Sequence, residues 1–150
     1  MPGKSFDPVL AENRKARHDY SILETVECGI VLSGTETKSA RNSSVSLPGA
    51  YVAVLKGELW LVGADIAAYS FGNRFNHDPK AMRKLLAHAK EIEELRLKSE
   101  AKGLTLIPLK MYLKGGRIKV SVGVCRGKNL RDKRESLKKE SLRREISASL

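Results

Sequence analysis

Residues 103–125 hold the pattern that most restricts what this chain can fold into. Over 107–113, and again over 118–124, apolar residues recur at every second position. Successive side chains of a strand point to opposite faces, so a period of two predicts two strands. Gly115 and Gly116 lie between them and adopt positive φ at little steric cost, as a tight turn requires. The sequence therefore predicts a β-hairpin around which a sheet must form.

The charge of the chain is concentrated in and after this hairpin. No acid occurs in residues 103–125, whose four cations are Lys110, Lys114, Arg117 and Lys119. Residues 126–150 add nine cations and four acids, and the 150-residue chain has a net charge of +11. Such a concentration is typical of a protein that binds a polyanion such as RNA. A solvated face that only keeps the protein soluble is the alternative.

The other elements are predicted from shorter patterns. Runs of β-prone residues broken by turns predict strands at 20–25, 29–38, 50–55, 59–62 and 66–69. Asp78 as N-cap and Gly103 as C-cap predict one long helix over 79–102, with an apolar stripe that includes Leu86. The small polar residues 39–44 favour a single helical turn.

These elements predict one mainly β domain over residues 13–125. We expect an antiparallel, partly closed barrel of the OB-fold type with Greek-key connections, flanked by one long and one or two short helices. Residues 1–12 contain two prolines and a glycine and are predicted to form a flexible N-terminal arm. The basic tail, 126–150, has only a thin apolar stripe. We expect it to be disordered when free and helical along an acidic partner.

Motifs for catalysis, cofactors and membranes do not occur in the sequence. The chain lacks the P-loop, dinucleotide-binding and serine-hydrolase patterns, and its three histidines have no spacing typical of metal ligands. No apolar run approaches the roughly 20 residues that span a bilayer. Cys28 and Cys125 are expected to be small buried hydrophobes, with a disulfide as the alternative. We therefore expect a cytoplasmic, non-enzymatic protein with no metal or other cofactor.

Three basic segments are candidates for RNA contact. Cations there suit phosphate, and rings suit unpaired bases. The alternative in the first segment is a charged lead-in whose Tyr20 belongs to the core. The candidate residues are Asn13, Arg14, Lys15, Arg17, His18 and Tyr20 in the first segment, Lys38, Ser39 and Arg41 in the second, and Arg126, Gly127 and Lys128 in the third.

Five blocks of the sequence resemble the SsrA-binding (SmpB) family, whose members bind transfer-messenger RNA. They are NRKARHDY from Asn13, GTETKSAR from Gly34, HDPKAMRKLLAHAKEI from His77, GLTLIPLKMYLKGGRIKVSVGVCRGK from Gly103 and DKRE from Asp132. The resemblance implies an OB-like barrel that holds the tRNA-like domain of this RNA. It also implies the rescue of stalled ribosomes by trans-translation, with the tail in the empty mRNA path in place of codon–anticodon pairing.

The same resemblance implies partners and site residues. The partners are transfer-messenger RNA, the small ribosomal subunit with its rRNA, and elongation factor Tu with the alanyl-charged RNA; the protein itself is expected to be a monomer. Glu27, Leu86 and Lys119 correspond to positions tied to RNA binding, although the helix pattern equally allows Leu86 in the core. The residues implied for the ribosome-binding tail are Asp132, Lys133, Arg134, Lys138, Lys139, Leu142 and Arg143. The competing hypothesis is a general OB-type RNA-binding or ribosomal module with an electrostatic tail.

Overall fold

The computed structural model describes residues 8–71 and 76–128, which form nine strands and three helices. The helices are α1 (Arg14–Asp19), α2 (Gly34–Arg41) and α3 (Ala89–Glu100). The strands are β1 (Val9–Glu12), β2 (Tyr20–Ile30), β3 (Val45–Ser46), β4 (Tyr51–Leu55), β5 (Glu58–Val62), β6 (Asp65–Ile66), β7 (Arg83–Leu86), β8 (Leu104–Lys114) and β9 (Arg117–Gly127). No helix of this described part is long and apolar enough to cross a membrane.

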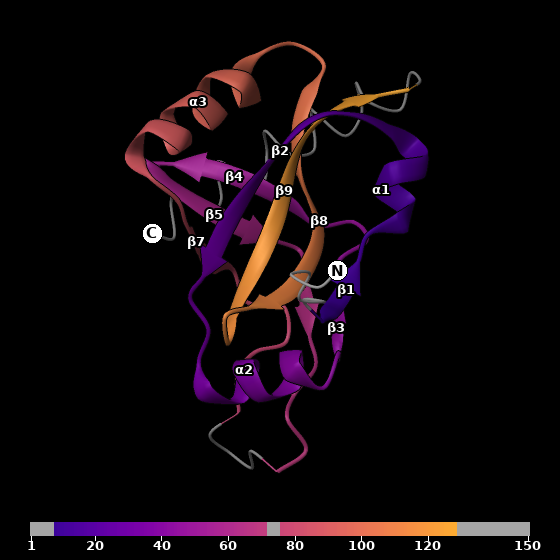
Figure 1. Ribbon diagram of the computed structural model, residues 1–150, viewed down its shortest axis with the longest axis vertical. Coiled ribbons are helices and arrows are strands. Elements are labelled where there is room, and N and C mark those ends of the chain that lie inside the picture. The colour runs from indigo at the N-terminus through magenta and orange to yellow at the C-terminus, as the bar shows by residue number, and fades with distance from the viewer. Residues whose placement is uncertain (1–7, 72–75, 129–150) are drawn as a thin grey trace, which may run out of the picture.

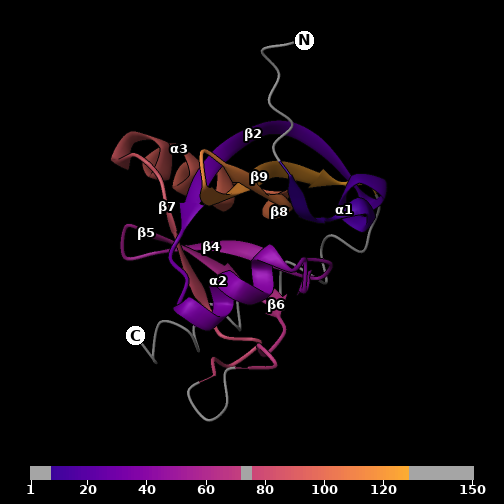
Figure 2. The ribbon, with the colours of Figure 1, turned by 60° about the horizontal axis from the view of Figure 1, so that its bottom comes forward.

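Seven of the strands form one curved antiparallel sheet. Its strand order is β1-β8-β9-β2-β7-β5-β4, and β3 pairs with β6 in a small second sheet. The end strand β4 contacts β8 without pairing with it, so the sheet bends around its own inner face. Figure 2 shows β2, β9 and β8 on one side of this bend and β4 on the other. The predicted mainly β, antiparallel architecture with flanking helices is confirmed.

The main hydrophobic core fills the inside of the bend. Val120, Val122 and Val124 of β9 pack there with residues of β4, β5 and β7. Leu95 of α3 and Ala40 of α2 join the same core, and these helices lie at opposite ends of the molecule (Figure 1). Each helix therefore covers one end of the barrel.

The two cysteines are buried and belong to separate clusters. Cys28 lies in the main core and Cys125 in a second, outer cluster. Burial raises the pKa of the Cys28 thiol to about 11. The expectation of two small buried hydrophobes is confirmed.

The predicted hairpin is confirmed, and it contains one irregularity. β8 and β9 pair from Leu104↔Arg126 to Lys114↔Arg117, with a shift in register at Leu109. A Cβ at Gly123 would lie 2.7 Å from a Leu109 methyl carbon, so only glycine leaves room for that side chain. The bulge thus lets Leu109 pack on the outside of the sheet, in the cluster with Cys125.

The predicted helix over 79–102 is wrong in its first half. Residues 83–86 form β7, and α3 starts only at Ala89, where the Glu91 carboxylate accepts a hydrogen bond from the His88 N–H at 3.1 Å. Arg83 and Leu85 point inward while Lys84 and Leu86 point outward. Arg83 hid the alternation of this strand, because a charged side chain usually marks an outward position. Its counter-ion, Glu36, lies 47 residues away in the sequence.

The strand predicted over 29–38 is wrong after Ile30, and the helical turn predicted over 39–44 is in fact the end of a longer helix, α2. β2 ends at Ile30, and α2 begins after Ser33, which forms a capping box with Glu36. The Ser33 Oγ accepts from the Glu36 N–H at 3.3 Å, and the Glu36 carboxylate accepts from the Ser33 N–H at 2.8 Å. In the strand predicted over 66–69, only Ile66 belongs to β6.

Both boundaries of the predicted domain need correction. Residues 9–12 are not a flexible arm, because they form β1 and pair with β8. At the other end, Arg126 and Gly127 belong to β9 rather than to a tail. Neither strand extension has a strong alternation of its own, and both are held by the neighbouring strand. Residues 129–150 lie outside the described part.

Candidate nucleic-acid interface

The outer face of the sheet brings together three candidates that are far apart in sequence. The register places Gly29 of β2 opposite both Leu86 of β7 and Lys119 of β9. Glu27 lies on the same face of β2, two residues before Gly29, and Tyr112 of β8 pairs with Lys119. We call Glu27, Leu86, Tyr112, Lys114 and Lys119 the sheet-face cluster.

Gly29 forms the floor between Leu86 and Lys119. A Cβ there would lie 3.4 Å from the Leu86 Cβ and 3.9 Å from the Lys119 Nζ. The Lys119 ammonium therefore reaches over the β2 backbone towards Leu86. Leu86 is 49% exposed, whereas its neighbour Leu85 is 1% exposed and fills the core. The structure thus places Leu86 on the surface, beside a cation.

Glu27 is held as a carboxylate by its neighbours. The Tyr112 hydroxyl donates to its Oε2, and the Lys114 Nζ lies 3.3 Å from the same oxygen. The Tyr112 hydrogen bond is the main cause that lowers the pKa of Glu27, and Lys114 and Lys119 lower it further. A charged carboxylate in this place can orient the two lysines or accept hydrogen bonds from base amino groups.

Tyr112 is a residue of this face that the sequence analysis did not single out. It fixes Glu27, and the Lys110 Nζ lies 5.1 Å from its ring centroid, a cation–π contact. The available signal was its position: an aromatic ring alternating with Lys110 and Lys114 on the outward face of a strand.

A second basic group, the α1 cluster, lies at the other end of the same face. Ala16 packs α1 against Ile107, Leu109 and Cys125 on the outside of the sheet. The end of β9 reaches the helix, where the Lys128 N–H donates to the Asp19 carbonyl at 3.2 Å. The exposed cations of α1 and its His18 ring therefore lie near Arg126 and Lys128 at the end of β9. The members of the α1 cluster are Arg14, Lys15, Arg17, His18, Arg126 and Lys128.

Asn13 and Tyr20 both make contacts within the fold. The Asn13 side chain is buried; it accepts from the Ala16 N–H at 3.1 Å and donates to the Pro108 carbonyl at 3.0 Å. It therefore caps α1 and ties it to β8. Tyr20 is half-buried and packs against the outer cluster under α1. Gly127 pairs with Tyr20 inside the sheet.

The second predicted basic segment lies on α2, away from the α1 cluster. Ser39 is 2% exposed, so its hydroxyl is not available to a phosphate and this part of the prediction is wrong. Lys38 and Arg41 are both exposed. Arg41 donates to the Gly116 carbonyl at 3.2 Å, which places α2 beside the hairpin turn.

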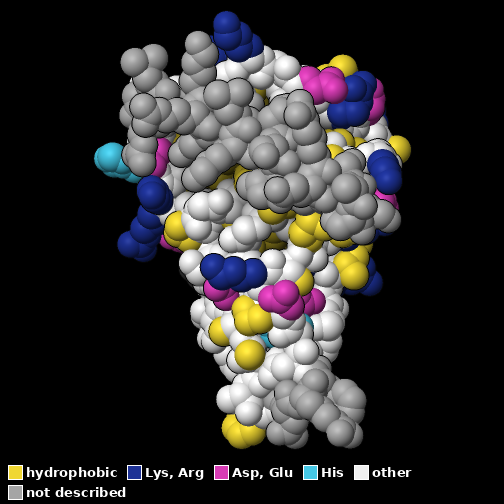
Figure 3. Space-filling model, turned by 180° about the vertical axis from the view of Figure 1, so that it is seen from behind, with side chains coloured by type: hydrophobic (Ala, Val, Ile, Leu, Met, Phe, Trp, Pro, Cys, Tyr) yellow, Lys and Arg dark blue, Asp and Glu magenta, His cyan; other side chains and the backbone are white. Residues whose placement is uncertain are grey.

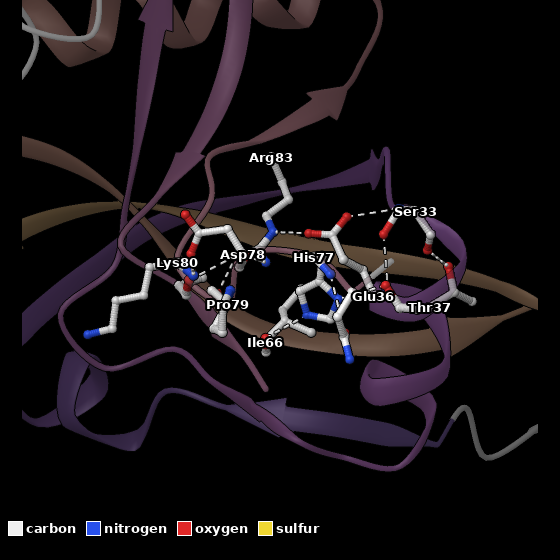
Figure 4. A network of polar contacts seen from close by, with 12 residues as sticks. Ser33, Glu36, Thr37, Ile66, His77, Asp78, Pro79, Lys80 and Arg83 are labelled. Carbon is white, nitrogen blue, oxygen red and sulfur yellow. Dashed lines mark hydrogen bonds and ion pairs between the residues drawn. The ribbon is translucent and has the colours of Figure 1, made fainter. Parts of the chain in front are cut away.

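A buried ion pair supports the α2 end of the molecule, and the sequence analysis did not find it. The Arg83 Nε donates to the Glu36 carboxylate at 2.6 Å, and the two side chains point toward each other in Figure 4. Arg83 also donates to the carbonyls of Ala64 and Pro79 at 3.0 Å and of Asp78 at 3.1 Å. The ion pair therefore links α2 and β7 to the loop before β6, through Ala64, and to the loop before β7, through Asp78 and Pro79.

Burial by itself raises the pKa of Glu36. Hydrogen bonds from Ser33 and Arg83, together with the Arg83 charge, outweigh that effect and hold the pKa below its ordinary value.

The described part of the opposite side, as far as Figure 3 shows it, is mixed in charge. On the described surface seen in Figure 3, lysine and arginine side chains lie next to acidic ones rather than in one continuous group. The outer face of β2, β9 and β8 is therefore the better candidate for a polyanion. The predicted tail residues, from Asp132 to Arg143, lie outside the described residues.

The family model described as SmpB protein matches residues 10–150. The chain is 50% identical over 147 residues to the SsrA-binding protein of Ligilactobacillus salivarius, covering 98% of this chain and 95% of that protein. It is 49% identical over 150 residues to the SsrA-binding protein of Staphylococcus saprophyticus, covering 100% of this chain and 97% of that protein.

The chain is also similar to a solved structure. It is described as "tmRNA-SmpB: a journey to the center of the bacterial ribosome", and its chain is similar with a TM-score of 0.69 and 48% identity. The match covers 87% of this chain and 94% of that one.

Proposed function

The chain belongs to the SmpB protein family, and we propose how it performs the role that this membership brings. It is an RNA-binding adaptor in trans-translation, with transfer-messenger RNA and the bacterial ribosome as its partners. Its chemistry is binding rather than catalysis, and it acts in the cytoplasm, where the ribosome lies. The folded part binds the tRNA-like domain of the RNA through the outer face of β2, β9 and β8.

The observation that supports this face is the convergence of Glu27, Leu86 and Lys119. The resemblance to the SmpB family implied a role in RNA binding for each of these residues. They lie on three different strands, and the strand register brings them together around Gly29. Their chemistry is complementary. An exposed apolar side chain can contact the flat face of an unpaired base, and the neighbouring ammonium can bind the phosphate of the same strand. Glu27 keeps Lys114 in place and offers an acceptor.

The α1 cluster extends this surface. Arg14, Lys15 and Arg17 are exposed on one short helix, and Arg126 and Lys128 end the adjacent strand. These cations bind phosphates and orient the RNA, whereas the sheet-face cluster contacts its loop bases.

The basic segment after Lys128 performs the second half of the adaptor function. With seven cations in residues 129–150, it binds the small ribosomal subunit along the empty mRNA path. There it takes the place of codon–anticodon pairing. Elongation factor Tu accompanies the alanyl-charged RNA in this complex.

The experiment that tests the RNA face is Lys119→Ala, measured against the isolated tRNA-like domain over a series of salt concentrations. Loss of one phosphate contact should weaken binding and reduce the slope of log affinity against log salt by about 1. Lys119→Arg, which keeps the charge, should retain most of the affinity.

The control is Lys102→Ala, an exposed lysine in the turn between α3 and β8. It removes the same charge elsewhere and should leave the slope nearly unchanged. Equal effects of the two alanine variants would contradict the sheet face as the binding site. Equal affinity of the natural protein for an ordinary tRNA would favour the competing hypothesis, a general RNA-binding module.

A further inference from the structure

We propose that Lys38, Tyr69 and Phe71 form a separate stacking site for an unpaired RNA base, at the end of the molecule opposite the α1 cluster. The inference rests on the proposed function, in that the ligand is an RNA. The loop after β6 and the helix α2, which carry these residues, lie together at the lower end of Figure 1, away from α1.

The aromatic pair is unusually accessible. Phe71 is 78% exposed, the highest value among the exposed large hydrophobic residues of the described part. Its ring centroid lies 5.5 Å from that of Tyr69, with the planes 68° apart. In this edge-to-face arrangement the Tyr69 ring supports one edge of Phe71, and the phenyl face stays open to a planar ligand.

A cation completes the arrangement. The Lys38 Nζ lies 5.5 Å from the Tyr69 ring centroid, so it is held beside the aromatic pair. Arg41 is on the same helix, and its bond to the Gly116 carbonyl brings in the hairpin turn, with exposed Lys114 and Arg117 on either side. Rings next to a basic surface are the combination that binds single-stranded nucleic acid.

The base of the loop is fixed before any ligand arrives. The Asn76 side chain accepts from the Tyr69 N–H at 2.9 Å and donates to the Tyr69 carbonyl at 2.5 Å, as a neighbouring strand would do. The His77 ring is within hydrogen-bond distance of Thr35 Oγ1 on α2, at 2.9 Å, and of the Ile66 carbonyl, at 2.8 Å. Tyr69 is therefore anchored to the same scaffold as Lys38, which lowers the ordering cost of binding.

Glu36, two residues before Lys38 on the same helix, does not cancel this cation, because its carboxylate is engaged inside the molecule with Arg83. An unpaired base with its phosphate is therefore favoured as the ligand over a purely apolar protein segment. The base can come from transfer-messenger RNA or from ribosomal RNA, and the experiment separates the two.

The test is Phe71→Ala in the full chain, with binding measured separately to transfer-messenger RNA and to vacant small ribosomal subunits. Loss of one stacked base should weaken binding roughly 5- to 100-fold in one of the two measurements. That measurement identifies the source of the base. Phe71→Trp should keep the affinity, and its fluorescence should be quenched by the same RNA beyond the signal of Trp60.

Leu97→Ala is the matched control, because Leu97 is 57% exposed on α3 and lies outside the proposed site. If Phe71→Ala matches this control in both measurements, the inference is wrong. If Phe71→Leu binds as well as the natural chain, the contact is apolar rather than stacking, and the inference is again wrong. Lys119→Ala serves as the reference: if it weakens RNA binding while Phe71→Ala does not, the proposed function stands and only the stacking site falls.

Discussion

Removing the charge of Glu36 should destabilise the fold far more than removing the charge of an exposed glutamate. The Glu36 and Arg83 side chains are only 9% and 2% exposed. Glu36→Gln keeps the size of the side chain and its acceptor for the Ser33 N–H, but leaves the guanidinium as a buried charge without its counter-ion. The three backbone carbonyls that Arg83 contacts are neutral and compensate for this only in part.

The expected loss follows from the geometry. Breaking a buried ion pair by removing one partner costs roughly 3–5 kcal/mol. Because glutamine retains one hydrogen bond, we expect the lower end, about 3 kcal/mol. In a domain of this size, 1 kcal/mol corresponds to roughly 2–4 °C in Tm, so the midpoint should fall by about 6–12 °C. Urea unfolding followed by the fluorescence of the single tryptophan, Trp60, measures the free energy directly.

The dependence on pH gives a second, independent measure. The folded-state pKa of Glu36 lies below its ordinary value, so the unfolded chain binds more protons at this group. Its contribution is complete above the unfolded-state pKa and is lost as the pH falls through the folded-state pKa. Between neutral pH and about pH 3, the natural chain should therefore lose more free energy of unfolding than Glu36→Gln.

Two comparisons decide whether this reasoning holds. Glu93→Gln breaks an exposed pair with Arg96 on α3 and should change stability little. The double variant Glu36→Leu with Arg83→Met should recover much of the loss, because a buried ion pair is often replaced by apolar residues at small cost. Equal stability of Glu36→Gln and Glu93→Gln would refute the role assigned to the buried pair.

Two further predictions concern the ends of the described chain. Asn13→Ala should lower the free energy of unfolding by about 1–2 kcal/mol, because it removes the cap of α1 and the hydrogen bond to the Pro108 carbonyl. Lys15→Ala on the same helix should leave stability unchanged and weaken RNA binding. If instead Asn13→Ala weakens RNA binding and leaves stability unchanged, Asn13 is an RNA ligand after all. A chain that ends at Lys128 should still bind transfer-messenger RNA but fail to support tagging of stalled polypeptides in a reconstituted translation assay; a parallel loss of both activities would favour the electrostatic-tail hypothesis.

The local features of the fold were predictable from the sequence, and the non-local ones were not. The β8–β9 hairpin rests on alternation and a two-glycine turn, both of which lie within a few residues of each other. β7 has no such signal, since its inward arginine reads as a polar position of a helix. Only Glu36, 47 residues away, makes that inward position tolerable. A pattern read over a short window cannot contain this partner.

The same limit applies to the candidate interface. The alternation of apolar residues in β9 correctly predicts that Lys119 points outward, because all the residues that form the pattern lie in the same strand as Lys119. The position of Leu86 depends on whether its segment is helix or strand, which the buried ion pair decides. Asn13 and Ser39 look like surface residues by type, but both are buried, and the Asn13 side chain satisfies the backbone at the start of α1. For polar residues, therefore, capping competes with ligand binding as the reason for their presence.

In this small sheet, the residues that stabilise the fold are separate from the residues that form the binding surface. Inward positions of β9 carry Val120, Val122 and Val124, whereas outward ones carry Lys119, Ser121 and Gly123. A substitution on the outward set changes charge or contact area without opening a cavity, and one on the inward set does the reverse. Leu86 and Leu85 extend this separation into β7: the exposed residue lies beside Lys119, and its buried neighbour lies in the core. Affinity for RNA and stability of the fold should therefore vary independently along these strands. Gly123 is the exception, because a Cβ at this outward position would lie 2.7 Å from a Leu109 methyl carbon, so the position also serves packing.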